Sequence, residues 1–180
     1  SATLTCLPWD GSKGGVLVFN VLNTLNLNAD IDVSGKGFRG GQAVISNASG
    51  IFNQLDYAYP ANLVNGARKG EGITEVSENL IFCRGPLSSG GGGANSMNAG
   101  GGGGGNGGIG GKGGNEWGGA PPPVLTVGGM GGKTYGNVAI SNKIFMGGAG
   151  GSGHGNDASA TSGGNGGGIV IINTNDINPN

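Results

Sequence analysis

The stretch from Gly100 to Gly119 reads GGGGGGNGGIGGKGGNEWGG, and from Gly104 to Asn115 it repeats two glycines followed by one other residue. The residues between the glycine pairs are Asn106, Ile109, Lys112 and Asn115. A period of three fits neither the α-helix nor the β-strand. It fits an extended left-handed helix of the polyproline-II type, with three residues per turn. The twelve residues of this repeat, 104–115, are therefore predicted to form one polyglycine-II rod with a length of roughly 37 Å, and their four other side chains are predicted to lie along a single ridge.

Such a rod has no internal hydrogen bonds, so its backbone groups need partners on neighbouring segments. Candidate partners are the glycine-rich segments 90–93, 128–132, 147–153 and 163–168. Bare glycine edges would let these backbones approach one another closely. The glycines expected to support this packing are Gly104, Gly105, Gly107, Gly108, Gly110, Gly111, Gly113 and Gly114. The alternative interpretation is a flexible glycine linker.

The composition restricts the classes of function. Glycine supplies 46 of the 180 residues, charged residues make up 11%, and the formal net charge is −1. The chain has no basic stripe, which argues against nucleic-acid binding. It has no apolar run of the roughly 20 residues that a membrane-spanning helix needs, which argues against membrane insertion. One domain is expected from the length.

Outside the glycine-rich region the sequence predicts short β-strands. Residues 15–21 form a nearly continuous apolar run, and residues 24–33 alternate between apolar and polar positions. Further short strands are predicted at 1–6, 43–46, 138–145 and 169–172, and residues 76–83 fit a strand or a helical turn. The predicted fold class is all-β, with short strands packed with a bundle of polyglycine-II helices and almost no α-helix. The β-rich part is placed at 1–85 and the polyglycine part at 86–168.

The two ends of the chain carry similar sequences. Residues 14–20 read GGVLVFN and residues 167–173 read GGIVIIN. The similarity predicts either a segment of a longer repetitive protein, in which 169–180 begins the next unit, or a domain whose two ends pair side by side.

The two cysteines, Cys6 and Cys83, lie beside apolar residues. They are compatible with one disulfide or with two buried free thiols. Their spacing does not fit a zinc site, and no metal ligand set is predicted.

No catalytic constellation is visible, and the protein is expected not to be an enzyme. The only histidine, His154, lies between glycines, which favours a turn or the end of a rod over a catalytic triad. No cofactor is predicted. Calcium binding through Asp30, Asp32 or Asp157 has no motif to support it.

Four segments carry a family resemblance: GKGFRGG at 35–41, RKGEGI at 68–73, the run from Cys83 to Gly114, and FMGGAGGSGHGN at 145–156 followed by GGNGGGIVII at 163–172. Together they resemble a glycine-rich domain of large secreted bacterial surface proteins, similar to repetitive adhesins that the type IX secretion system of gliding bacteria exports. The resemblance implies a cell-surface location and a role in cell adhesion or gliding motility. It implies as partners the neighbouring domains of the same long chain, surface polysaccharide or the export machinery.

The expected function is therefore a non-enzymatic structural or adhesive module. Surface contact is expected from the loop residues Tyr57, Tyr59, Arg68, Lys69 and Trp117, because aromatic rings stack on sugars and tolerate partial exposure. The alternative is that these aromatic residues cover the core. A carbohydrate- or ice-binding module that uses a flat polyglycine face is a second functional hypothesis, and a polysaccharide-acting enzyme is a third.

Overall fold

The computed structural model describes residues 2–45, 57–58, 66–95, 98–115, 126–136, 142–155 and 159–179. Tyr59, Trp117 and Asp157, which the sequence analysis singled out, lie outside these residues.

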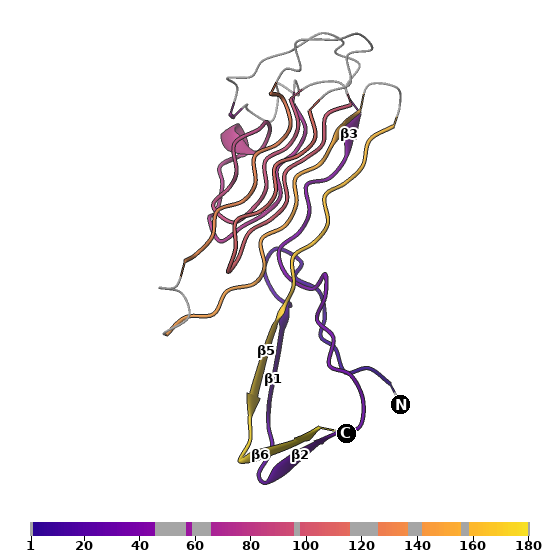
Figure 1. Ribbon diagram of the computed structural model, residues 1–180, viewed down its shortest axis with the longest axis vertical. Coiled ribbons are helices and arrows are strands. Elements are labelled where there is room, and N and C mark those ends of the chain that lie inside the picture. Colours follow the sequence, from indigo (N-terminus) through magenta and orange to yellow (C-terminus); the bar gives the residue numbers. More distant parts are fainter. Residues whose placement is uncertain are drawn as a thin grey trace.

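The molecule has two parts that meet end to end (Figure 1). One part is a bundle of extended glycine-rich segments lying side by side, which we call the rods. The other part is a three-sided arrangement of strands formed by residues 2–33 and 169–179, which we call the coil. The rods comprise residues 36–42, 66–72, 81–85, 89–95, 98–105, 109–115, 126–133, 146–153 and 161–168.

The regular elements are short strands, and they pair in parallel. In the coil, β1 (Val16–Asn20) pairs with β5 (Ile169–Asn173), and β2 (Thr24–Leu27) pairs with β6 (Asp176–Pro179). At the far end of the rods, β3 (Val44–Ile45) pairs with β4 (His154–Gly155). The helical residues of the described chain are one 3-10 turn, η1 (Glu78–Leu80). The prediction of an all-β fold with almost no α-helix is confirmed.

The rod 146–153 shows how the glycine-rich segments are held together. Its successive N–H groups donate to three different neighbouring rods, and the pattern repeats every third residue. Gly147, Gly150 and Gly153 donate to the rod 161–168, Gly148 and Gly151 donate to the rod 98–105, and Ala149 and Ser152 donate to the rod 66–72. A helix with three residues per turn directs its groups in three directions in this way. The hydrogen bonds of this rod therefore follow the threefold pattern that such a helix would give.

The strictly periodic stretch forms two rods and not one. The chain reverses at 106–108, where the N–H of Asn106 donates to the carbonyl of Gly108 at 3.0 Å. Beyond this turn the rods 98–105 and 109–115 run antiparallel, since Gly103 donates to Gly111 at 2.8 Å. The prediction of a single long rod is wrong because a chain that folds back pairs its own backbone groups, which one long rod would leave to other segments.

The predicted ridge of side chains is shorter for the same reason. Asn106 belongs to the turn, whereas Ile109, Lys112 and Asn115 remain exposed or partly exposed along one edge of the second rod. Within this ridge the Lys112 Nζ donates to the Asn115 Oδ1 at 2.9 Å.

Glycine is required wherever one rod faces the backbone of another. A Cβ built on Gly110 would lie 2.1 Å from the carbonyl oxygen of Gly103, and a Cβ on Gly131 would lie 1.7 Å from that of Gly110. These separations are shorter than any van der Waals contact, so a side chain would push the rods apart. Of the glycines predicted to support packing, Gly104, Gly105, Gly110 and Gly113 meet neighbouring backbone in this way, whereas Gly107, Gly108, Gly111 and Gly114 have no such atom within 4 Å.

The coil brings the two ends of the chain together in the register of the sequence similarity. Val16 lies opposite Ile169 and Asn20 lies opposite Asn173 in the β1–β5 pair. The second side of the coil, β2–β6, places Asn26 opposite Asn178, and the Asn178 Nδ2 donates to the Asn26 Oδ1 at 3.2 Å. The sequence similarity between residues 14–20 and 167–173 therefore corresponds to strand pairing within one molecule.

The third side of the coil joins the start of the chain to residues 29–33. Leu4 lies opposite Ile31; its N–H donates to the carbonyl of Asp30 at 2.9 Å, and its carbonyl accepts from Asp32 at 2.9 Å. Apolar and polar residues alternate in burial along 24–33, as predicted, although β2 itself ends at Leu27 and the chain bends at Ala29.

The apolar core among the described residues is small. Its cluster of buried hydrophobic residues consists of Ala67, Ala94, Ala99 and Val127, all on the rods. Small side chains at these positions fill the space between rods without separating them.

Other details differ from the sequence-based expectations. Rods already occur at 36–42 and 66–72, so the bundle does not begin at position 86. Residues 76–83 contain η1 and an isolated bridge between Phe82 and Arg68. Residues 142–145 contain no strand, and 138–141 lie outside the described residues. Strand β6 was not predicted, because Asn and Pro disfavour strands in isolation.

Neighbouring glycines in one rod test the importance of close backbone contact. Gly110→Ala should lower the free energy of unfolding by about 2–3 kcal/mol, because its Cβ meets backbone that cannot move aside. Gly111→Ala, one residue along the same rod, faces open space and should leave stability unchanged or raise it by about 0.4–1 kcal/mol. Urea titration of both variants measures the difference, and equal stability of the two would contradict the packing of the rods.

Candidate functional site

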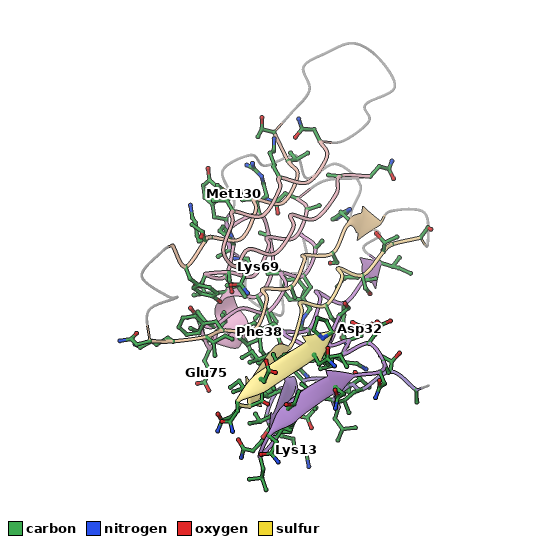
Figure 2. The ribbon with its side chains drawn as sticks, turned by 60° about the horizontal axis from the view of Figure 1, so that its bottom comes forward. Lys13, Asp32, Phe38, Lys69, Glu75 and Met130 are labelled. Carbon is green, nitrogen blue, oxygen red and sulfur yellow. The ribbon has the colours of Figure 1, made fainter. Side chains whose placement is uncertain are left out.

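An open cleft of about 1060 Å³ lies where the coil meets the rods. Its lining comes from the turn at 9–12, from Phe38 and Arg39 on the first rod, and from residues 68–82. Trp9 and Phe38 meet edge to face with ring centroids 6.3 Å apart. Figure 2 shows Phe38 close to the junction of the two parts and Lys69 among the rods. The cleft thus combines aromatic, apolar and charged surface.

The strongest polar feature of the cleft is the pair formed by Arg39 and Glu71. The Arg39 Nε donates to the Glu71 Oε1 at 2.8 Å, its Nη2 contacts the same oxygen, and its backbone N–H donates to Oε2 at 3.0 Å. The Arg39 Nη1 also donates to the Asp10 carbonyl at 2.8 Å. These bonds connect two rods to the turn at the base of the coil.

The pKa of Glu71 reflects this pairing. Burial acts to raise the pKa of the carboxyl group, but the hydrogen bonds and the charge of Arg39 outweigh it and hold the pKa below its usual value. Glu71 is therefore an ionised hydrogen-bond acceptor at neutral pH and not a general acid. The pair connects the two parts of the molecule and has no free group for catalysis.

Lys69 is buried between the rods, with 5% of its surface exposed. Its Nζ donates to the Tyr57 carbonyl at 2.6 Å. Burial lowers the pKa of Lys69 to about 8, against a smaller opposing effect of Cys83. The prediction that Lys69 is an exposed contact residue is wrong, because rod 66–72 is covered by neighbouring rods.

Tyr57, whose carbonyl holds Lys69, is itself exposed, with 48% of its surface accessible. The guanidinium group of Arg84 lies 5.7 Å from the centre of its ring, and the buried Arg84 Nε donates to the Gly128 carbonyl at 3.0 Å. The ring is thus held against the rods while one part of it faces solvent.

The other predicted contact residues are distributed as follows. Arg68 is half-buried and lines the cleft. Tyr59 and Trp117 lie outside the described residues. The sequence analysis did not identify Arg39 and Glu71, because no pattern links residues 32 positions apart.

Cys6 and Cys83 are not joined by a disulfide. Cys83 is fully buried in the rod 81–85, whereas Cys6 is partly exposed in the coil. The structure therefore agrees with the interpretation as two thiols, of which Cys83 is buried and Cys6 is not.

His154 lies at the end of the rod 146–153, in β4 opposite Val44, so the structure agrees with the predicted rod end and not with the turn. It is 5% exposed, and burial lowers the pKa of its imidazole. Within the described part of the chain, its Nδ1 has no hydrogen-bond partner. The side chain is therefore neutral at pH 7.

The acidic side chains of the described residues do not gather into a metal site. In the ranges given above, no three histidine, cysteine or acidic side chains lie close enough to hold a metal ion together. Asp30 and Asp32 lie on the third side of the coil, where the Asp32 Oδ1 accepts from the N–H of Ser34 at 2.8 Å. No helix in the described ranges has the length and apolar character needed to cross a bilayer.

The chain matches no protein-family model, no curated protein and no solved structure.

The burial of Lys69 predicts an unusual pH dependence. Its pKa is about 8 when folded and 10.5 in its ordinary state, so the unfolded chain binds more protons between these values and stability should rise with pH across this window. Urea unfolding at pH 7.5, 9 and 10.5 measures this rise. Lys69→Met should remove it, and a rise that persists in the variant would assign it to other groups.

The thiols give a second test of the structure. Under native conditions without reductant, Ellman's reagent should react readily with Cys6 and not with the buried Cys83. In guanidinium chloride both thiols should react. An intact mass two hydrogens lower than the reduced value would instead show a disulfide.

Proposed function

We propose that the protein is a non-enzymatic structural and adhesive module of a secreted bacterial surface protein. The observation that carries this proposal is the network of backbone hydrogen bonds between rods that are distant in sequence. It connects the rods 66–72, 98–105 and 161–168 through the single rod 146–153. A module joined in this way is stiff without a large apolar core.

The pairing of charged groups in the described cleft supports a non-enzymatic role. The charges of Arg39 and Glu71 neutralise each other, and the Nζ of the buried Lys69 donates to the Tyr57 carbonyl. What the region offers to a partner is the exposed ring of Tyr57 and the aromatic edge formed by Trp9 and Phe38. Aromatic rings of this kind stack on the faces of sugars.

Carbohydrate binding on a flat polyglycine face is a second candidate function. Gly111 and Gly114 on one rod, and Gly164 and Gly167 on another, have open space where a side chain would project. These rods therefore present bare backbone to solvent. Ice binding is less well supported, because the ridge of Ile109, Lys112 and Asn115 lacks a regular array of one residue type.

An adhesion assay tests the proposal. Beads coated with the protein should attach to bacterial cells or surface polysaccharide, and Tyr57→Ala should reduce attachment several-fold, because the exposed ring is lost. Tyr135→Ala is a matched control: that ring is partly buried and packs on Phe145 with centroids 4.6 Å apart. Melting curves must show that both variants fold.

The outcomes separate the two functions. Unchanged attachment by Tyr57→Ala would make this module a spacer and place adhesion elsewhere. Binding on a glycan array that survives Tyr57→Ala but is lost when Gly111 and Gly114 are both replaced by Val would favour the polyglycine face.

A further inference from the structure

The guanidinium group of Arg68 is a charged group of the cleft without a partner of its own. Arg68 is partly buried and lines the cleft. In the part of the chain that the structure describes, no carboxylate or carbonyl oxygen accepts from this group. The neighbouring basic groups differ, since Arg39 is paired with Glu71 and Lys69 donates to the Tyr57 carbonyl. A guanidinium group that is partly withdrawn from water without an acceptor is available to bind an anion.

The three-residue repeat of the rod 66–72 fixes the direction of the Arg68 side chain. The Arg68 carbonyl accepts from Ser152 at 2.8 Å, and the Glu71 carbonyl accepts from Ala149 on the same rod at 3.0 Å. Residues three apart on such a rod have the same orientation, so the side chains of Arg68 and Glu71 follow one another along one edge. Burial acts to raise the pKa of the Glu71 carboxyl group, and the charge of Arg68 adds to that of Arg39 in lowering it. Arg68 therefore lies one turn of the rod, roughly 9 Å, from the Arg39–Glu71 pair.

The cleft also has surface that fits a sugar ring. Trp9 and Phe38 meet edge to face and are both partly exposed. Ser12 and Thr74 are exposed and line the same cleft, and hydroxyl groups both donate to and accept from sugar hydroxyls. The volume of about 1060 Å³ is at the upper end of the range for sites that hold small molecules. A sugar that carries an anionic group would thus meet both aromatic rings and a guanidinium group.

Two carboxylates at the rim limit the charge of such a ligand. Glu75 and Glu78 are exposed and line the cleft, and Figure 2 shows Glu75 close to η1. Among the described residues, neither carboxylate joins an ion pair. A polysaccharide with a carboxylate on every sugar would bring some of its charges next to these residues, and like charges repel. The cleft therefore favours acidic sugars that are separated by neutral ones.

We propose that the cleft binds a polysaccharide in which uronic acid residues alternate with neutral sugars. Arg68 pairs with a uronic carboxylate through two parallel N–H donors, and Trp9 and Phe38 pack on the ring of the neighbouring neutral sugar. Glu75 and Glu78 reject chains of denser charge. This inference rests on the adhesive function proposed above, because it names the class of surface polysaccharide to which the module attaches.

The probes are three hexasaccharides, measured by isothermal titration calorimetry at low and physiological salt. The hyaluronan hexasaccharide alternates glucuronic acid with N-acetylglucosamine, the chitin hexasaccharide has no carboxylate, and the polygalacturonate hexasaccharide has one on every sugar. One-to-one binding of the hyaluronan probe, at least tenfold tighter than either of the others, is the expected result. Equal binding of the chitin probe, or no binding of the hyaluronan probe up to millimolar concentration, would overturn the proposal.

Protein variants locate the binding. Arg68→Gln should weaken the binding of the hyaluronan probe at least tenfold, and Arg68→Lys should restore only part of it, because an ammonium group lacks the planar fork of donors. Lys133→Gln removes the same charge from an exposed position on the rod 126–133 and should leave the affinity unchanged. Replacing Glu75 and Glu78 together by Gln should tighten the binding of the polygalacturonate probe several-fold. An unchanged affinity in Arg68→Gln, or an unchanged preference among the probes in the double variant, would overturn the proposal.

The indole Nε1–H resonance of Trp9 gives an independent measurement should Arg68→Gln fail to fold. The chain has two tryptophans, so the spectrum of Trp117→Phe assigns this resonance. The hyaluronan probe should shift it saturably, and an unshifted resonance would overturn the proposal. Attachment of beads to cells that depends on Tyr57 and not on Arg68 would also overturn it and leave the adhesive function standing. Binding of the hyaluronan probe without attachment of the beads would support the site and contradict the adhesive function.

Discussion

The hydrogen bond from a glycine N–H to the carbonyl of a neighbouring rod is the interaction on which this structure depends. Rods approach so closely that a Cβ would collide with backbone, as the 1.9 Å separation between a Cβ on Gly104 and the Gly148 carbonyl oxygen illustrates. Ordering glycine is costly, and a lone glycine rod would not persist in water. Each rod is therefore stable only because several others satisfy its backbone groups at once. This cooperativity explains how the chain can adopt a defined fold although the apolar cluster among its described residues consists of small side chains, alanines and one valine.

Charged and aromatic side chains at the base of the coil join the rods to the coil. Arg39 reaches Glu71 on one side and the carbonyl of Asp10 on the other, and Trp9 meets Phe38 beside them. The two parts differ in their internal repeat, since the rods repeat every third residue and strands every second. These side chains add to the backbone bonds that cross the same junction, such as those from Gly168 to Val33 and from Trp9 to Lys36.

The sequence predicted the features that repeat and missed those that depend on contacts distant along the chain. The period of three at 104–115 predicted extended rods, and the similarity between 14–20 and 167–173 corresponded to the β1–β5 register. The reversal at 106–108 was missed because Asn106 continues the same period, although the Asn106-Gly107 pair is a turn signal. The burial of Lys69 and the pairing of Arg39 with Glu71 depend on which rods become neighbours. The local sequence does not determine which rods become neighbours.

The repetitive geometry of the rods has a consequence for their alignment. Every turn of a glycine rod resembles the next, so sliding one rod along another by a single turn would recover most backbone bonds. What distinguishes one alignment from another is a small number of side chains, such as Ser152, whose Oγ accepts from the N–H of Arg68 at 2.9 Å, and Asn165, whose Oδ1 accepts from Gly40 at 2.8 Å. Insertion of a whole Gly-Gly-x triplet into each of the two rods that an exposed turn joins can therefore lengthen both rods and keep every other alignment. Insertion of one or two residues would rotate the rod and direct each of its amides toward the wrong neighbour.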